Sequence, residues 1–124
     1  MKKKLSAVTL VVILVFSLSI SAFARWNSTD ICYTTLSFSG TTANCGLNVE
    51  TINSSDKITA KLELKNPSGT VIKTWSNITG TGYLSFGDTY SPVSKGTYTL
   101  VATVTVTGSN GTDNIVVSSS AAKP

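Results

Sequence analysis

Strict alternation of apolar and polar residues is the feature that most limits how this chain can fold. The segment KITAKLELK, residues 57–65, has an apolar side chain at every second position, and TYTLVATVTV, residues 97–106, follows the same pattern. A period of two places successive side chains on opposite faces of a β-strand, whereas a helix groups apolar residues three and four apart. Both segments are therefore predicted to be strands with one buried face and one solvated face.

Five further strands are predicted from shorter runs bounded by Gly, Pro and Asn turn signals. They span residues 31–38, 43–52, 70–76, 83–86 and 113–119. Residues 87–93 are expected to form a loop, and the tail up to Pro124 is expected to be loose. Several short strands joined by turns predict an all-β fold, an antiparallel β-sandwich of the immunoglobulin-like or fibronectin type. A small open β-barrel is the alternative.

The first 24 residues have the three parts of a secretory signal peptide. Three lysines at 2–4 precede an apolar run, and Ala22-Phe23-Ala24 has the small-x-small form of a cleavage site. We expect cleavage between Ala24 and Arg25, which leaves one secreted domain over residues 25–124, with cell-surface association as a further option. The alternative is a retained membrane anchor, because an apolar stretch of roughly 18 residues is at the lower limit for spanning a bilayer. Serines in its second half and the well-formed cleavage site argue against an anchor, so no stable membrane insertion is expected after cleavage.

The net charge argues against a nucleic-acid partner. The chain carries +4, but three of its ten basic residues belong to the predicted signal peptide. Seven basic residues then face six acidic ones, which gives the predicted mature domain a net charge of +1. No basic stripe remains to act as the electrostatic footprint of nucleic-acid binding.

Cys32 and Cys45 are the only cysteines, and they lie on the first two predicted strands. Counting outward from a turn centred near Ser39 brings them nearly opposite each other, at a separation that a disulfide spans. Export favours oxidation, and closing a loop of this size would add about 3 kcal/mol of stability in the chain-entropy model. The spacing is much longer than that of a redox Cys-x-x-Cys pair, and a zinc site would need more ligands. We predict a structural disulfide, with free thiols as the alternative.

The absence of histidine removes several kinds of catalysis. It excludes Ser-His-Asp chemistry, most zinc catalysis and the commonest general base. Glu63 is expected to pair with neighbouring lysines, and Glu50, Asp56 and Asp113 are expected to cap turns. The oxygen-rich turn at residues 110–114 lacks the spacing of a calcium loop. We therefore predict no enzyme activity, no cofactor and no metal site.

Aromatic residues are the remaining functional candidates. Sugar-binding β-sandwiches stack exposed aromatic rings against their ligands. Trp75, Tyr83 and Tyr90 are the candidates for this role, but packing in the core or at a sheet edge is the alternative that we favour. Tyr98, the Tyr of a Gly-x-Tyr signal at the start of a long strand, is expected to lie in the core or to form a tyrosine corner.

Five short motifs occur in order along most of residues 26–107. They are Trp26, TTANC at 41–45, ITAKLEL at 58–64, TWS at 74–76 and KGTYTL at 95–100. In this order they resemble a group of small secreted bacterial proteins of unknown function, a domain-of-unknown-function family. The chain departs from that pattern in having GTTANC in place of a more compact Gly-Ala-Cys run, and Thr99 where a basic residue often follows the Tyr. The resemblance implies secretion and an immunoglobulin-like sandwich, and it supplies no activity.

These observations leave three functional hypotheses. The leading one is a secreted, non-enzymatic interaction or surface module whose partner is an unknown protein or glycan. The alternative is a carbohydrate- or cell-wall-binding module that uses exposed aromatic rings. A secreted toxin or antimicrobial fits less well, because the predicted mature charge is near neutral and no cationic amphipathic helix is visible.

Overall fold

The computed structural model describes residues 26–124, and the predicted signal peptide with its cleavage site at Ala24 and Arg25 lies outside the described residues. Every regular element within 26–124 is a strand, and this part of the chain contains no helix able to cross a membrane. Each of the seven predicted strands has an observed counterpart. The strands are β1 (Thr29–Ser39), β2 (Thr42–Thr51), β3 (Lys57–Lys65), β4 (Val71–Thr81), β5 (Tyr83–Tyr90), β6 (Gly96–Gly108) and β7 (Gly111–Lys123).

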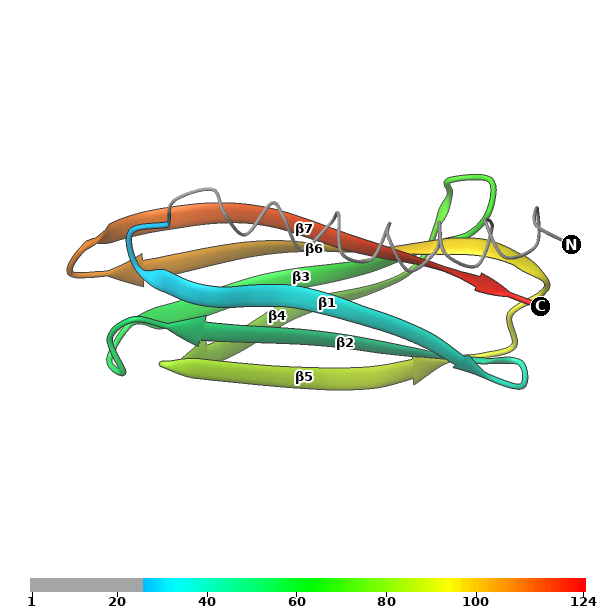
Figure 1. Ribbon diagram of the computed structural model, residues 1–124, viewed down its shortest axis with the longest axis horizontal. Helices are drawn as coiled ribbons and strands as arrows, with labels where there is room; N and C mark the ends of the chain where they lie inside the picture. The colour runs from blue at the N-terminus through cyan, green and yellow to red at the C-terminus, as the bar shows by residue number, and fades with distance from the viewer. Residues whose placement is uncertain (1–25) are drawn as a thin grey trace, which may run out of the picture.

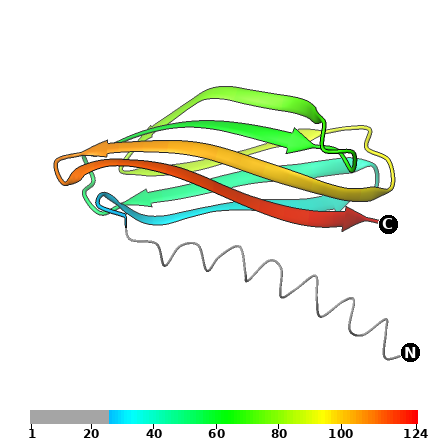
Figure 2. The same ribbon diagram turned by 90° about the horizontal axis from the view of Figure 1, so that it is seen from above.

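The strands form two antiparallel sheets that pack face to face (Figures 1 and 2). The three-stranded sheet has the order β1-β2-β5, and the four-stranded sheet has the order β4-β3-β6-β7. The sheets meet where β4 turns into β5, through the single pair Thr81↔Tyr83. Strands β1 and β7, at the two ends of the strand order, do not pair, so the sheets do not close into a barrel. The predicted β-sandwich is confirmed.

The crossing from one sheet to the other depends on Gly82. Its φ of 74° lies in the left-handed region, which favours glycine. A Cβ at this position would lie 2.6 Å from the carbonyl oxygen of Ser54. The Gly82 N–H donates to the carbonyl of Asp56, and the Gly82 carbonyl accepts from the N–H of Thr51. Both backbone conformation and space therefore require glycine here.

The core lies between the sheets and is centred on the two alternating strands, β3 and β6. The face that alternation predicts to be buried is buried, so this prediction is confirmed. Each leucine buried in this way contributes about 1.5–3 kcal/mol relative to an exposed one. Four neighbouring pairs across these strands bury all eight side chains: Ile58↔Val106, Ala60↔Val104, Leu62↔Ala102 and Leu64↔Leu100.

Three strands extend by four or more residues beyond their predicted ends. β4 continues to Thr81, whereas its predicted end is residue 76. β5 continues to Tyr90, where the sequence predicts a loop from residue 87, and β7 continues to Lys123, where it predicts a loose tail. The end of β7, SSSAAK, has no β-branched or aromatic residue. It is held as a strand by pairing with β6 as far as Gly96↔Lys123. Strand propensity depends strongly on cross-strand partners, and the local sequence does not reveal these.

The predicted disulfide between Cys32 and Cys45 is wrong, because the β1–β2 hairpin keeps the two residues apart. The register places Cys32 opposite Val49 and Cys45 opposite Leu36, an offset of four positions. At about 3.4 Å per residue this is about 14 Å along the strands. A disulfide needs Cα atoms within about 7 Å of each other. Both thiols are free and buried.

The position of the turn explains the error. The hairpin closes with Ser39 paired to Thr42, so the turn is formed by Gly40 and Thr41 and is not centred near Ser39. Gly40 has a φ of 60°, which suits a tight turn. Burial raises the pKa of Cys32 to about 12 and that of Cys45 to about 11. Both residues therefore remain thiols at neutral pH and act as small apolar side chains in the core.

Candidate functional site

The outer surface of the three-stranded sheet carries the strongest candidate site. Side chains that point away from the core align in rows across its strands, because the register pairs outward residues with outward residues. Successive rows lie about 7 Å apart along the strands. The four rows are Ile31–Glu50–Tyr83, Tyr33–Asn48–Ser85, Thr35–Gly46–Gly87 and Ser37–Asn44–Thr89.

Two exposed tyrosines flank one end of this surface. Tyr33 on β1 is 45% exposed and Tyr83 on β5 is 57% exposed. Together with Ile31, Asn48 and Glu50 they line a hollow of about 150 Å³. A tyrosine ring offers an apolar face and a polar hydroxyl, while the amide and carboxylate between the rings can donate and accept hydrogen bonds. The hollow therefore suits a small ring that has apolar faces and polar edges.

Two paired glycines form the floor of a second hollow, which has a volume of about 520 Å³. A Cβ at Gly46 would lie 2.5 Å from Thr35 Oγ1, whereas at Gly87 the nearest atom, the carbonyl oxygen of Cys45, is 3.8 Å away. A ligand can therefore approach the backbone closely above Gly87. Asn48 lines both hollows, so the two adjoin at this residue. We call the two hollows together the outer trough.

The outer trough carries little charge. Glu50 lines one hollow and Asp88 lines the other. No lysine or arginine lies on β1, β2 or β5. The surface therefore provides no attraction for phosphate groups or other polyanions. All lysines of the described chain lie elsewhere: Lys57, Lys61 and Lys65 on β3, Lys73 on β4, Lys95 in a loop and Lys123 on β7.

Trp75 points into the sandwich and does not contribute to the outer trough. Ile78 lies opposite Ala60 and Trp75 opposite Leu62, so β4 holds one extra residue in this stretch. Asn77, within this bulge, has a φ of 57°. The bulge changes the direction of the strand's side chains. Trp75 is only 8% exposed as a result.

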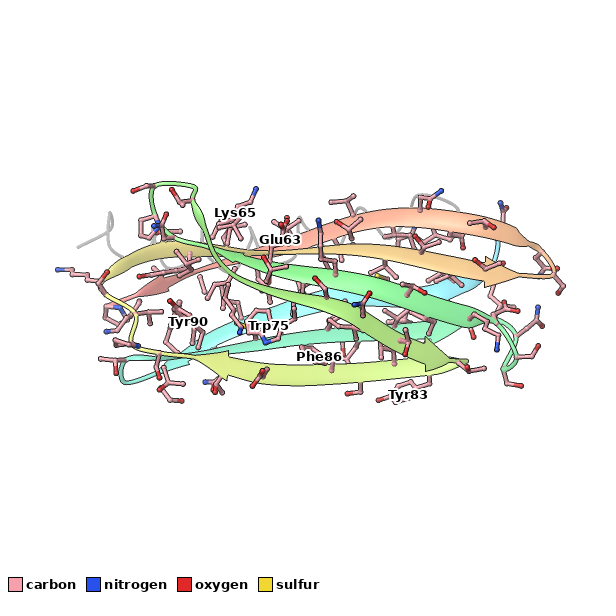
Figure 3. The ribbon with its side chains drawn as sticks, turned by 180° about the vertical axis from the view of Figure 1, so that it is seen from behind. Glu63, Lys65, Trp75, Tyr83, Phe86 and Tyr90 are labelled. Atoms are coloured by element: carbon pink, nitrogen blue, oxygen red, sulfur yellow. The ribbon has the colours of Figure 1, made fainter. Side chains whose placement is uncertain are left out.

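The Trp75 indole closes the space between β4 and β5 (Figure 3). Its Nε1 donates a hydrogen bond of 2.8 Å to Asp88 Oδ2, and its ring packs edge-on against Phe86 with the centroids 6.3 Å apart. The backbone N–H of Thr89 and the Trp75 indole both lower the pKa of Asp88. Trp75 is therefore a packing residue, the alternative that the sequence left open.

Tyr90 lies at the opposite end of β5 from Tyr83 (Figure 3). It is partly buried and lines a separate groove of about 620 Å³ between the β3–β4 loop and the β5–β6 loop, together with Pro67 and Lys95. Trp75, Tyr83 and Tyr90 therefore do not share one site.

Tyr98 forms part of the wall of the groove that Tyr90 lines. It is 2% exposed. Its hydroxyl donates to the carbonyl of Ser94 at 2.9 Å and accepts from the Ser94 N–H at 3.0 Å. This is the arrangement of a tyrosine corner at the start of a late strand, so that prediction is confirmed.

Asp113 is buried, and its carboxylate fixes the chain that leads into β1. It accepts hydrogen bonds from the N–H groups of Asn27 and Ser28 at 2.9 and 2.8 Å, and from Thr29 Oγ1 at 2.8 Å. Burial alone would raise the pKa of Asp113, but these hydrogen bonds outweigh burial and lower it. The carboxylate is therefore engaged in structure.

Asp56 is the other buried carboxylate of the described chain. It is 3% exposed, and its Oδ2 has no hydrogen-bond partner. A Cβ at Gly108 would lie 2.3 Å from this carboxyl group, so glycine is the residue that fits beside it. Within residues 26–124 no three His, Cys, Asp or Glu side chains gather into a possible metal site.

Only part of the outer trough can be identified from the sequence. Tyr83 is predicted as a site residue, whereas Tyr33, Gly46 and Gly87 are not. Tyr33 points outward because Cys32 and Thr34 on either side of it are buried, which only the structure shows. Nothing in the local sequence indicates that the two glycines are paired.

No protein-family model matches the chain, and no curated protein sequence is similar to it. Its fold is similar to the solution structure of a late embryogenesis abundant type protein, with a TM-score of 0.53 and 14% identity over 98% of this chain and 85% of the other. A CARDB domain of a Pyrococcus furiosus protein in complex with di-metal ions gives a TM-score of 0.44 and 18% identity over 77% of this chain and 91% of the other. A Parabacteroides merdae β-glucuronidase gives 0.47 and 11% over 77% of this chain, which spans 13% of that enzyme. The likeness to the late embryogenesis abundant type protein shows a shared fold and nothing further, and the resemblance to small secreted bacterial proteins stays a prediction.

Proposed function

We propose that this chain is a secreted, non-enzymatic binding module whose ligand contacts the outer trough of the three-stranded sheet. One observation carries the proposal. Two exposed tyrosines, Tyr33 and Tyr83, lie on either side of Asn48 and Glu50, and this hollow adjoins a second one with a floor of paired glycines. Aromatic rings grouped around a few convergent polar groups are typical of a ligand site.

The carboxylates of the described chain support a binding role over catalysis. Asp113 is held by the segment before β1, Asp88 by Trp75, and Glu63 lies 3.8 Å from Lys61. Glycoside hydrolysis would need two such groups facing one cleft. Glu50 is the only carboxylate in the tyrosine-flanked hollow. The predicted signal peptide adds secretion to the proposal.

The opposite outer surface of the sandwich is less suited to a ligand. There, β6 presents alternating threonines, and β3 presents lysines beside them. Its hollow of about 290 Å³ is lined by polar residues such as Thr59, Lys61 and Thr103 and contains no aromatic ring. This face is a regular solvated sheet surface, and it provides a control for experiments on the outer trough.

The proposal is tested by changing each outer surface separately. The purified protein is labelled and its binding to the envelopes of the cells that produce it is measured, with Tyr83→Ala on one face and Lys61→Ala on the other. Circular dichroism verifies that both variants are folded. We expect Tyr83→Ala to reduce binding and Lys61→Ala to leave it unchanged. Equal binding by both variants, or loss with Lys61→Ala alone, would contradict the proposal.

A further inference from the structure

We infer that the ligand of the outer trough is a neutral polysaccharide chain that lies along the strands of the three-stranded sheet. This inference rests on the proposed function and names the ligand class of the same site. It is carried by the shape of the trough, by the chemistry of the groups that line it, and by the distribution of charge over the two sheets.

The shape of the trough suits a chain molecule. Its two hollows lie one after the other along the strands and adjoin at Asn48. The rows from Tyr83 to Thr89 are three steps apart, which is about 20 Å at 3.4 Å per residue. This length accommodates several sugar rings in sequence, whereas a compact small ligand would use only one hollow.

The tyrosine-flanked hollow provides the two kinds of contact that a sugar ring makes. A pyranose has apolar C–H faces and a perimeter of hydroxyl groups. The exposed rings of Tyr33 and Tyr83 can cover such faces. Asn48 and Glu50 lie between the rings and can bind neighbouring hydroxyl groups with an amide and a carboxylate.

The glycine floor continues the same chemistry with neutral groups. Above Gly87 the nearest atom to a missing Cβ is 3.8 Å away, so a ring can lie directly on the backbone. The side chains around this floor include Ser37, Asn44 and Thr89, which offer hydroxyl and amide groups. A row of neutral donors and acceptors beside a flat floor matches a polyhydroxylated ligand.

Charge selects among polysaccharides. The three strands of this sheet carry Asp30, Glu50 and Asp88 and no lysine or arginine. These carboxylates would repel an acidic glycan, a teichoic acid or a nucleic acid, whereas they would not repel a neutral glycan. The lysines of the described chain lie on the other sheet, in a loop and at the end of β7.

A protein partner fits these observations less well. Protein interfaces are centred on a fully desolvated apolar cluster surrounded by a polar rim. On this surface the exposed large apolar side chain beside the tyrosines is Ile31, and the centre of the trough consists of glycine backbone with amide and hydroxyl groups. A protein partner is therefore one of the contrary outcomes of the test.

The experiment measures retention of the full-length purified protein on insoluble neutral polysaccharides, namely cellulose, chitin, xylan and mannan, with polygalacturonate as the anionic control. Envelope polysaccharide from the producing cells is included. Three variants act on the trough. Tyr83→Ala removes a ring, Tyr83→Phe keeps the ring, and Gly87→Val fills the floor at a position with room for a side chain. The matched control is Thr103→Val, which places the same valine on a strand of the opposite surface.

We expect retention on a neutral polysaccharide that weakens about tenfold or more with Tyr83→Ala and with Gly87→Val. Tyr83→Phe should bind within about threefold of the natural chain, because the ring is retained. Thr103→Val should bind like the natural chain. Circular dichroism on all four variants separates a lost site from a lost fold, and a β-branched residue in place of a strand glycine favours the fold.

Three results would overturn the inference. The first is retention that Tyr83→Ala and Gly87→Val leave unchanged. The second is binding to polygalacturonate in preference to the neutral materials. The third is the absence of retention on every material tested.

A photo-crosslinking residue introduced at Ser85, in the second row of the trough, separates failure of this inference from failure of the proposed function. A protein captured there, but not by the same residue at Thr103, would overturn the glycan ligand and leave the outer trough as a binding face. No capture at Ser85 and no retention on polysaccharide would overturn both.

Discussion

The two open sides of the sandwich are closed by different chemistry. On one side β1 lies beside β7, and on the other β4 lies beside β5; in neither case does a backbone ladder run along the pair (Figures 1 and 2). The β1/β7 side is held by buried polar groups. Asp113 binds the segment before β1, and Thr34 Oγ1 donates to Ser119 Oγ at 2.9 Å.

The β4/β5 side is closed by aromatic packing. Trp75 and Phe86 fill the space between the strands, and the one side-chain hydrogen bond across it connects the Trp75 indole to Asp88, which is exposed. The two sides show that the same kind of gap between two sheets can be closed by packed aromatic rings or by a buried carboxylate whose hydrogen bonds are all formed. Asp113 is a buried carboxylate that accepts three hydrogen bonds, whereas Asp88 on the β4/β5 side is exposed, so the stability of the β1/β7 side should depend more strongly on pH.

The largest effect is expected on the β4/β5 side. Trp75→Ala removes a large side chain that is 8% exposed, and should reduce the free energy of unfolding by about 3–5 kcal/mol. The loss should be similar at pH 7 and at pH 4.5, because the contribution is mainly apolar. Urea unfolding followed by circular dichroism measures both values. A loss below about 1 kcal/mol would show that aromatic packing does not close this side.

A smaller but pH-dependent effect is expected on the β1/β7 side. Asp113→Ala removes the acceptor of three hydrogen bonds and should cost about 2–3 kcal/mol at pH 7. Hydrogen exchange should show faster exchange at the N–H groups of Asn27 and Ser28 than in the natural chain. If those amides keep their protection, water or another acceptor has replaced Asp113.

The pH profile distinguishes the two sides directly. The pKa of Asp113 is lowered in the folded chain, so its contribution is fully present above the unfolded value of about 4 and is lost as the pH falls through the folded value. Stability should therefore decrease below about pH 4, and Asp113→Asn should flatten this decrease. Asp88 is an exposed carboxylate whose pKa is also lowered, so Asp88→Asn is the matched control. It should flatten the decrease in stability less than Asp113→Asn does. The comparison fails if Asp88→Asn, and not Asp113→Asn, removes the greater part of the decrease in stability at low pH.

The smallest effect concerns the neutral contact on the β1/β7 side. Thr34→Val keeps the shape of the side chain and removes the hydroxyl that donates to Ser119. It should change the free energy of unfolding by about 1 kcal/mol or less, with no dependence on pH. Thermal unfolding at pH 7 and pH 3.5 tests this. A loss as large as that of Asp113→Ala would mean that neutral hydrogen bonds, and not the carboxylate, hold this side together.

The sequence predicts the strands well and their partners poorly. Alternation identifies β3 with its observed bounds and the buried face of β6, since burial of one face requires only a period of two. The hairpin between β1 and β2 is also visible in the sequence. Its register is not, because a displacement of the turn by two residues moves Cys45 from Cys32 to Leu36.

The candidate site shows the same limit. Tyr83 is a candidate from the sequence, whereas the outward direction of Tyr33 is known only from the burial of Cys32 and Thr34 beside it in the structure. Their common hollow depends on two separate pairings, β1 with β2 and β2 with β5, which join residues that are far apart in the chain. The inward position of Trp75 depends on a bulge at Asn77 that its neighbours in the sequence do not signal.

The sequence by itself determined that this chain forms strands with one apolar face each, because apolar and polar residues alternate along them and successive side chains of a strand point to opposite faces. It also fixed the low positive charge and the lack of histidine, which limit the chemistry of the chain. Only the tertiary structure decided which residues share a surface. Cross-strand register is set by turn geometry and by the pairing of distant segments, and these place Tyr33, Tyr83 and two glycines on one face while they separate the two cysteines.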